Sequence, residues 1–504
     1  MAAFLRSSTI VRTLFELTVE VDSSSIRLEE RGVQVQRVIT QRGAIDLGQN
    51  GVASGNFVDV ITGPNGCGKT ELLDVLLQDA IELRPSPNSQ RKIWPVVYSK
   101  GTPNKVVVQT FSPFSRFVVP RVDRTPLTKR YIEEEVEQEK YVCVGLHKAS
   151  RSVGAGLSRK VLEEALFRLS ENPKTVDILF SVLSELGFQT QFSLGYRPKP
   201  TFLKLFDDDA NGQGLEAYLG DLQSRNYHPS FARLFQEFNL DYGKSFLDLL
   251  RHSLDIVREH REYRRKSYRL PISLQNVRSE FHTIQAFALL RRLGLLILTS
   301  CELATNNFDS IDVAKTSSGQ QQMLCAIFGL STSISNGCLV LLDEPELSLH
   351  PEWQLKFVDA LFRILYSVQD AHVIMATHSP LVVQQAVQHG ADVVQMGDSA
   401  SSSVVSSHTF SGTSMSVEQT LVDVFRTPVS DSAHVSNEIF QAVLKGETGS
   451  TADKEEALAT LKQLDEIYRS KRGGKTASLV RDAIQLINTP DDLPASIDEL
   501  ISDE

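Results

Sequence analysis

The chain of 504 residues is poor in cysteine and has no long uninterrupted run of apolar residues. Its cysteines are odd in number and form no Cys-x-x-Cys pair, which excludes a disulfide framework and a cysteine-rich zinc site. They are Cys67, Cys143, Cys301, Cys325 and Cys338. Scattered free thiols suit a reducing compartment, so we expect a cytoplasmic protein. No stretch reaches the roughly 18–20 apolar residues of a membrane span, and we expect neither a span nor a signal peptide.

Glycine, proline and basic charge are also limited. The 29 glycines and 19 prolines are too few for a collagenous or largely disordered chain. Asp and Glu outnumber Lys and Arg by 62 to 52, a net charge of −10, so any contact with nucleic acid must come from a local basic patch. A hydrophobic fraction of 41% supports a sizeable core, and the length allows one to three domains.

The most specific pattern is a glycine-rich loop. Residues 63–70, Gly-Pro-Asn-Gly-Cys-Gly-Lys-Thr, match G-x-x-x-x-G-K-[ST] in full, between an apolar run at 57–62 and an amphipathic pattern at 71–77. Backbone N–H groups of such a loop face phosphate oxygens, Lys69 would reach the β- and γ-phosphates, and the Thr70 hydroxyl would take a Mg²⁺ position. A plain glycine turn between strand and helix is the alternative. The predicted ATP-binding residues are Asn65, Gly66, Cys67, Gly68, Lys69 and Thr70.

A second apolar run, residues 338–342, ends in an acidic pair. It is typical of a buried parallel strand, whose carboxyl end would lie beside the phosphate loop. We expect Asp343 to hold Mg²⁺ and Glu344 to act as the general base that polarises the attacking water. Two acids after a strand are by themselves more often a helix cap, but the phosphate loop favours the catalytic interpretation.

A histidine ends a third apolar run. Residues 371–376 lead into Thr-His-Ser-Pro, which places His378 one helix and one strand after Asp343. A histidine at a strand end is usually a surface residue or one with its own local partner. The spacing favours a position beside the γ-phosphate, so we expect His378 to act with Glu344 and Lys69 in catalysis.

A serine-glycine turn precedes an apolar helix. Residues 316–322 read Thr-Ser-Ser-Gly-Gln-Gln-Gln, and the apolar pattern continues over 323–330. A turn of this kind at a helix N-terminus can bind an anion. A simple serine helix cap is the alternative if the turn is taken alone.

Phosphate loop, serine-glycine turn, acidic pair and histidine, in this order, resemble the ABC-type ATPase head over residues about 13–115 and 300–400. The resemblance implies an α/β fold with a mixed β lobe, a parallel-sheet RecA-like core, a helical insertion and a helical C-terminal region. Residues 346–351 resemble the soluble branch, which includes RecF-like and structural-maintenance-of-chromosomes (SMC) ATPases and the overcoming-lysogenisation-defect (OLD) family. Residues 106–114 resemble a strand of the anti-phage ATPases of Septu and retron systems.

In such heads the serine turn of one subunit closes over ATP held by another. The resemblance therefore implies that Ser317, Gly319 and Gln320 contact the nucleotide across a head-to-tail homodimer. Thr316 and Ser318 depart from the family's Leu-Ser-Gly-Gly-Gln pattern, which leaves the rate of hydrolysis open.

A glutamine downstream of the loop is a further metal candidate. Gln109 follows Lys69 by 40 residues and resembles the Mg²⁺-sensing glutamine of the family. A buried polar residue in a strand is an equally good interpretation.

Four segments are expected. Residues 1–124 would form the first half of the head, 125–295 a mainly helical insertion, 296–400 the second half and 401–504 a helical region with an acidic tail. Within the insertion, the basic and tyrosine-containing run 251–269 fits either a nucleic-acid contact or a solvated helix face.

The sequence thus predicts an ATPase that uses ATP and Mg²⁺ and works as a homodimer or a higher even oligomer. The resemblance favours the sensor subunit of an anti-phage defence system controlling a separate effector, such as a nuclease, because the last hundred residues lack the Glu and Asp-x-Asp pattern of a Toprim nuclease. A RecF- or SMC-like DNA repair ATPase, which would bind nucleic acid directly, is the main alternative. A transporter subunit and a scaffold that binds ATP without turnover remain open.

Overall fold

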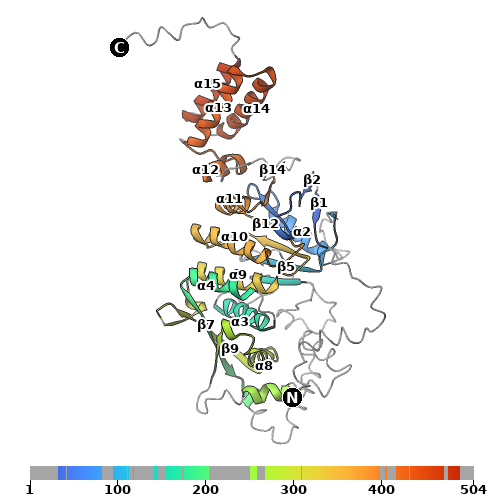
Figure 1. Ribbon diagram of the computed structural model, residues 1–504, viewed down its shortest axis with the longest axis vertical. Coiled ribbons are helices and arrows are strands. Elements are labelled where there is room, and N and C mark those ends of the chain that lie inside the picture. The colour runs from blue at the N-terminus through green and yellow to red at the C-terminus, as the bar shows by residue number, and fades with distance from the viewer. Residues whose placement is uncertain are drawn as a thin grey trace.

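Over the residues that it describes, the computed structural model contains three β-sheets, helices on both faces of the largest one, and a separate helical bundle near the C-terminus (Figure 1). No helix in the described part of the chain is long and apolar enough to cross a membrane. The structure describes residues 32–40, 43–81, 95–110, 112, 117, 141–145, 155–171, 175–203, 250–257, 267–307, 309–397, 403–405, 416–430, 432–469 and 475–488.

The largest sheet has seven strands in the order β14-β13-β3-β12-β11-β5-β6. Its neighbouring strands are parallel, except that β14 pairs antiparallel with β13. The apolar runs identified in the sequence form β3, β11 and β12, and these strands are buried along their whole length. The strands are β3 (Phe57–Thr62), β5 (Lys105–Thr110), β6 (Tyr141–Gly145), β11 (Cys338–Asp343), β12 (His372–Ala376), β13 (Asp392–Gln395) and β14 (Ser403–Val405). The predicted α/β fold with a parallel sheet is confirmed.

Helices cover both faces of this sheet, as burial of continuous apolar strands requires. On one face, Leu72 and Leu76 of α2 share a core with Val108 and Leu341. On the other face, the helices α9, α10 and α11 share a core with the alternate strand residues, such as Val107. The bounds are α2 (Lys69–Ala80), α9 (Ser318–Ser333), α10 (Pro351–Leu365) and α11 (Pro380–Gln388).

A small antiparallel sheet packs on the α2 side. Its order is β2-β1-β4, and Val35, Val38 and Ile45 join the core that contains Leu72. The strands are β1 (Val35–Thr40), β2 (Gly43–Asp46) and β4 (Val96–Tyr98). A β-rich lobe was expected before the phosphate loop, but its clearest alternating run, residues 14–21, lies outside the described residues.

Strands also occur in the segment expected to be mainly helical, 125–295. It contributes β6 to the central sheet, and β7 and β8 to a third, antiparallel sheet in the order β10-β9-β7-β8. The main partner of β7 is β9, which lies beyond residue 295, so this pairing had no local signal. The bounds are α3 (Ala155–Glu171), α4 (Val176–Glu185), β7 (Phe188–Pro198), β8 (Tyr268–Ser273), α8 (Phe281–Arg292), β9 (Leu296–Thr305) and β10 (Ser310–Asp312).

Three helices near the C-terminus form a bundle with its own core, which Figure 1 shows at one end of the molecule. The bundle follows a short α-helix and one turn of π-helix, η7, which lead from the central sheet toward it. The bounds are α12 (Val417–Gln419), η7 (Thr420–Val424), α13 (Ala433–Thr448), α14 (Thr451–Tyr468) and α15 (Lys475–Asn488). The acidic tail, 491–504, lies outside the described residues.

Candidate functional site

The phosphate loop joins β3 to α2, where the sequence predicted it. Three of its glycines have positive φ angles, 147° at Gly63, 81° at Gly66 and 105° at Gly68, a conformation that side chains disfavour. A Cβ on Gly63 would also lie 2.2 Å from the carbonyl oxygen of Met396. The tip, including Asn65 and Gly66, is exposed, so a ligand can reach its backbone N–H groups.

Lys69 lies across this loop. Its side chain is buried, and Nζ donates hydrogen bonds to the carbonyl oxygens of Gly63 at 2.9 Å and Pro64 at 3.2 Å. Cys67, whose Sγ lies 3.8 Å from Nζ, is buried beneath the loop. Phosphate oxygens are negatively charged, so they would be stronger acceptors for the Lys69 ammonium than these neutral carbonyls.

The first residue pair of the site joins the loop to β11. The Thr70 hydroxyl donates to Oδ1 of Asp343 at 3.0 Å, although the two residues are 273 positions apart. The pKa of Asp343 is raised to about 6, mainly by burial; the hydrogen bond from Thr70 opposes the rise, and the neighbouring Glu344 and Glu346 add to it. A hydroxyl and a carboxylate are the oxygen donors that Mg²⁺ prefers, so these residues fit a Mg²⁺ site.

The second pair is Glu344 and His378, which follow β11 and β12. Oε1 of Glu344 lies 3.9 Å from Nε2 of His378. Burial, and then the positive charge of Lys69, lower the pKa of His378, so its imidazole is neutral near pH 7. Glu344 has a φ angle of 49°, and strained backbone of this kind clusters at functional sites.

Glu346 is a site residue that the sequence reasoning treated only as part of a loop. Its Oε1 accepts a hydrogen bond of 2.7 Å from the backbone N–H of His378, so it fixes the turn that carries the histidine. Burial raises the pKa of Glu346. The only sequence signal was a second acid two positions after Glu344.

The serine-glycine turn begins α9. Ser317 and Gln320 form a capping box, in which the Ser317 hydroxyl accepts from the Gln320 N–H and Gln320 Oε1 accepts from the Ser317 N–H. Ser317 and Ser318 are exposed. Gly319 is buried, and a Cβ there would lie 2.9 Å from the carbonyl oxygen of Ser348. Ser317 therefore caps helix α9, as one interpretation of the sequence predicted, and it is also exposed to solvent, as an anion-binding turn requires.

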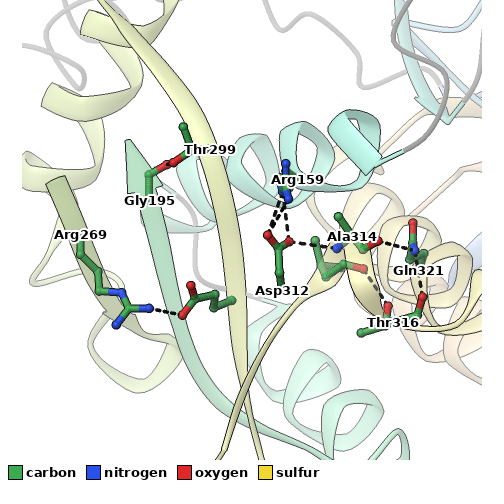
Figure 2. A network of polar contacts seen from close by, with 10 residues as sticks. Arg159, Gly195, Arg269, Thr299, Asp312, Ala314, Thr316 and Gln321 are labelled. Carbon is green, nitrogen blue, oxygen red and sulfur yellow. Dashed lines mark hydrogen bonds and ion pairs between the residues drawn. The ribbon is translucent and has the colours of Figure 1, made fainter. Parts of the chain in front are cut away.

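Helix α3 holds the segment that precedes this turn. Figure 2 shows Arg159 donating to both carboxylate oxygens of Asp312, with distances of 2.6 to 3.1 Å. Asp312 also accepts from the N–H of Ala314 at 3.0 Å, and Gln321 Nε2 donates to the carbonyl oxygen of Thr316 at 3.0 Å. The segment that leads into Ser317 is thus held on both sides.

Gln109 does not join the Thr70–Asp343 pair. Side chains alternate along β5, so Gln109 shares the face of Val107, whereas Thr110 shares the face on which α2 and Thr70 lie. Gln109 is 1% exposed, and within the described part of the chain neither of its side-chain polar atoms has a hydrogen-bond partner. The position of Gln109 therefore matches the buried-strand interpretation, and the prediction of direct Mg²⁺ contact is not supported by this geometry.

The basic run at 251–269 is only partly described, since residues 258–266 lie outside the described residues. Arg269 of β8 forms an ion pair with Glu302 of β9, and β7 lies between these two strands in the sheet. Figure 2 labels Arg269 and draws this ion pair as a dashed line.

Residues 207–384 match the family described as "AAA domain, putative AbiEii toxin, Type IV TA system". This segment, about a third of the chain, contains the serine-glycine turn, the acidic pair and His378, but not the phosphate loop. The chain is thus similar to AAA-type ATPase domains over this segment, and its parallel sheet with a phosphate loop matches P-loop ATPase folds. No curated protein matches the sequence.

Solved structures with similarity include a chain named as a metal-chelate type ABC transporter in an inward-facing conformation, with 14% identity over 79% of this chain and 89% of that chain and a TM-score of 0.27. Another is the Smc head domain of Pyrococcus furiosus with an extended coiled coil, bound to the C-terminal domain of ScpA. It has 10% identity over 78% of this chain and 99% of that chain, with a TM-score of 0.27. Both TM-scores are low, and the site described above rests on this chain's own geometry.

Proposed function

We propose that this protein is a cytoplasmic ABC-type ATPase that binds and hydrolyses ATP. The observation that carries the proposal is the meeting of three chain segments at the carboxyl ends of neighbouring strands. Thr70 follows β3, Asp343 ends β11, and His378 follows β12, which lies between them. This edge is where parallel α/β sheets bind ligands. The five free cysteines fit a reducing compartment.

Each side chain has a role in this proposal. Lys69 and the N–H groups of Asn65–Thr70 bind the β- and γ-phosphates, and Lys69 exchanges its two carbonyl acceptors for phosphate oxygens. Thr70 and Asp343 hold Mg²⁺, which when bound would neutralise charge on the phosphates. Glu344 accepts a proton from the attacking water, and the neutral imidazole of His378 lies beside it as a γ-phosphate contact.

We propose further that the complete site needs two copies of the chain. Ser317 is exposed and Gln320 is half-buried, whereas Gly319 is covered by Ser348. The described contacts of this turn run to its own helix and to the segment after Asp343. In a head-to-tail homodimer this turn would face ATP held by the partner copy. Because the turn is rigidly capped, it is ready to contact a phosphate without refolding.

The regulatory role is proposed from the resemblance and from the family description. The resemblance to Septu and retron ATPases, and the toxin and type IV system named in the family description, support an anti-phage sensor that controls a separate effector such as a nuclease. The alternative is a RecF- or SMC-like DNA repair ATPase. Strong, salt-dependent DNA binding by the purified chain alone would favour that alternative.

A complementation assay tests the dimer. Lys69→Ala removes the phosphate contact and Ser317→Arg blocks the turn, so each variant alone should lose ATPase activity. In a mixed dimer one site combines the two intact halves, and random mixing should restore about a quarter of the wild-type sites. Ser318→Ala, next to Ser317 and equally exposed, is the matched control and should remain active.

No recovery on mixing, with both variants folded, would contradict the proposal that Ser317 acts in trans. Full activity of Ser317→Arg alone would contradict any role of the turn. Native mass spectrometry of the protein purified from its own host with Mg-ATP then tests the regulatory part. A second protein in an even-numbered oligomer supports the effector model, whereas copurified DNA supports the repair alternative.

A further inference from the structure

A second cluster of potential metal ligands lies away from the nucleotide site, where the C-terminal bundle begins. Asp423 belongs to η7, and His434 and Glu438 lie one turn apart on α13. One ligand atom from each residue lies within 4.8 Å of the other two. Nε2 of His434 is 3.5 Å from Oδ2 of Asp423 and 3.7 Å from Oε2 of Glu438.

These separations are too long for good hydrogen bonds and close to those between ligands of one metal ion. Ligands about 2.0–2.1 Å from a tetrahedral Zn²⁺ lie about 3.4 Å from each other. Nε2 of His434 and Oε2 of Glu438 are also buried atoms that have no hydrogen-bond partner among the described residues. Orphaned buried polar atoms are uncommon in folded proteins, so this pair points to a missing third group.

The electrostatics of the cluster favour a cation. Two carboxylates that are partly removed from water and close to each other would be stabilised by a divalent ion between them. The three side chains remain 23% to 31% exposed, which leaves a path for entry.

Separate anchors hold the ligands in place. The carbonyl oxygen of Asp423 accepts a hydrogen bond of 2.8 Å from Nε2 of Gln395, at the end of β13. Ser432 caps α13 by accepting from the N–H of Val435, and its hydroxyl donates to Glu418 of the preceding helix. Single turns of π-helix such as η7 occur frequently at functional sites.

We propose that Asp423, His434 and Glu438 bind one divalent transition-metal ion. Imidazole with two carboxylates suits Zn²⁺ better than Mg²⁺ or Ca²⁺, which prefer oxygen alone, so Zn²⁺ is the ion to test. Water completes the coordination on the exposed side. Bound in this way, the ion links the first turn of the bundle to η7 and, through Gln395, to the central sheet.

Equilibrium dialysis of the untagged full-length protein against Zn²⁺, without nucleotide, tests the proposal. We expect one equivalent per chain, and His434→Gln should weaken binding by about 10- to 100-fold or more. His282→Gln removes an exposed histidine on α8 and should bind as the wild type does. Asp343→Asn should also bind one equivalent of Zn²⁺ per chain, because the nucleotide site is separate.

A second measurement uses only the wild-type protein, so it does not require that any variant folds. X-ray absorption at the zinc edge of the wild type should show one imidazole with oxygen ligands and no sulfur. Zinc–sulfur scattering would assign the ion to a cysteine instead and overturn the proposal. So would the absence of a stoichiometric equivalent in the wild type, or unchanged affinity in a folded His434→Gln or Asp423→Asn variant.

Discussion

Replacing Arg159 by glutamine should disturb the serine-glycine turn without changing any nucleotide-binding residue. The guanidinium donates to both oxygens of Asp312, and Asp312 orders the backbone at Ala314, three positions before Ser317 (Figure 2). Helix α3 thereby fixes the approach to the turn. The variant keeps a polar side chain, but this side chain is shorter and loses the charge and the two-point contact.

The magnitude follows from the exposure of the pair. The side chains of Arg159 and Asp312 are 23% and 10% exposed. Exposed ion pairs contribute about 0–1 kcal/mol, whereas breaking a fully buried pair costs about 3–5 kcal/mol. We therefore expect a loss of about 2 kcal/mol in the free energy of unfolding. Arg269→Gln, which breaks the more exposed pair with Glu302, is the control and should lose less than about 1 kcal/mol.

Urea denaturation of Arg159→Gln, Asp312→Asn and the double variant provides the assay. Because each single variant already removes the pair, the double variant should lose much less than the sum of the two losses. The ATPase kcat should fall in both single variants while the KM for ATP stays unchanged, since the phosphate loop is untouched. Additive losses in stability, or a change confined to KM, would refute the reasoning.

Three other outcomes are expected. Glu344→Gln should lower kcat by about 10²- to 10⁴-fold and leave ATP affinity unchanged, as measured by phosphate release and fluorescent-nucleotide binding; unchanged turnover would remove Glu344 as the base. Without nucleotide, stability should fall by up to about 3 kcal/mol as the pH rises from 4 to 7, because burial raises the pKa of Asp343 to about 6 and folding therefore favours its protonated form; denaturation at several pH values should show a smaller fall for Asp343→Asn. Gly63→Ala should abolish nucleotide binding, because its Cβ would lie 2.2 Å from the Met396 carbonyl oxygen, and calorimetry with ATP checks this.

The parts of the site that the sequence predicted depend on local patterns. Lys69 and Thr70 belong to one eight-residue motif, and Asp343 and Glu344 directly follow a continuous apolar run. Continuous apolar runs indicate buried parallel strands, and the carboxyl ends of such strands meet at one edge. The contact between Thr70 and Asp343 follows from that rule alone.

The features that the sequence did not predict depend on which face of a strand a side chain occupies and on contacts between segments far apart in the chain. The spacing of Gln109 from Lys69 gave no information about its face, which the alternation along β5 decides. The strand β7 pairs with β9 about a hundred residues later, so its segment carried no hairpin signal. His434 and Glu438 have helical spacing in the sequence, but only the fold brings Asp423 to them.

The position of β3 within its sheet has a consequence for synthesis on the ribosome. This strand carries the phosphate loop, and both of its neighbours, β12 and β13, are made last among the parallel strands. At about 5–20 residues per second, β13 follows β3 by roughly 20 to 70 seconds. Until β12 is made, the nascent chain contains the whole phosphate loop but neither neighbouring strand, so ATP can stabilise only the nearly finished polypeptide.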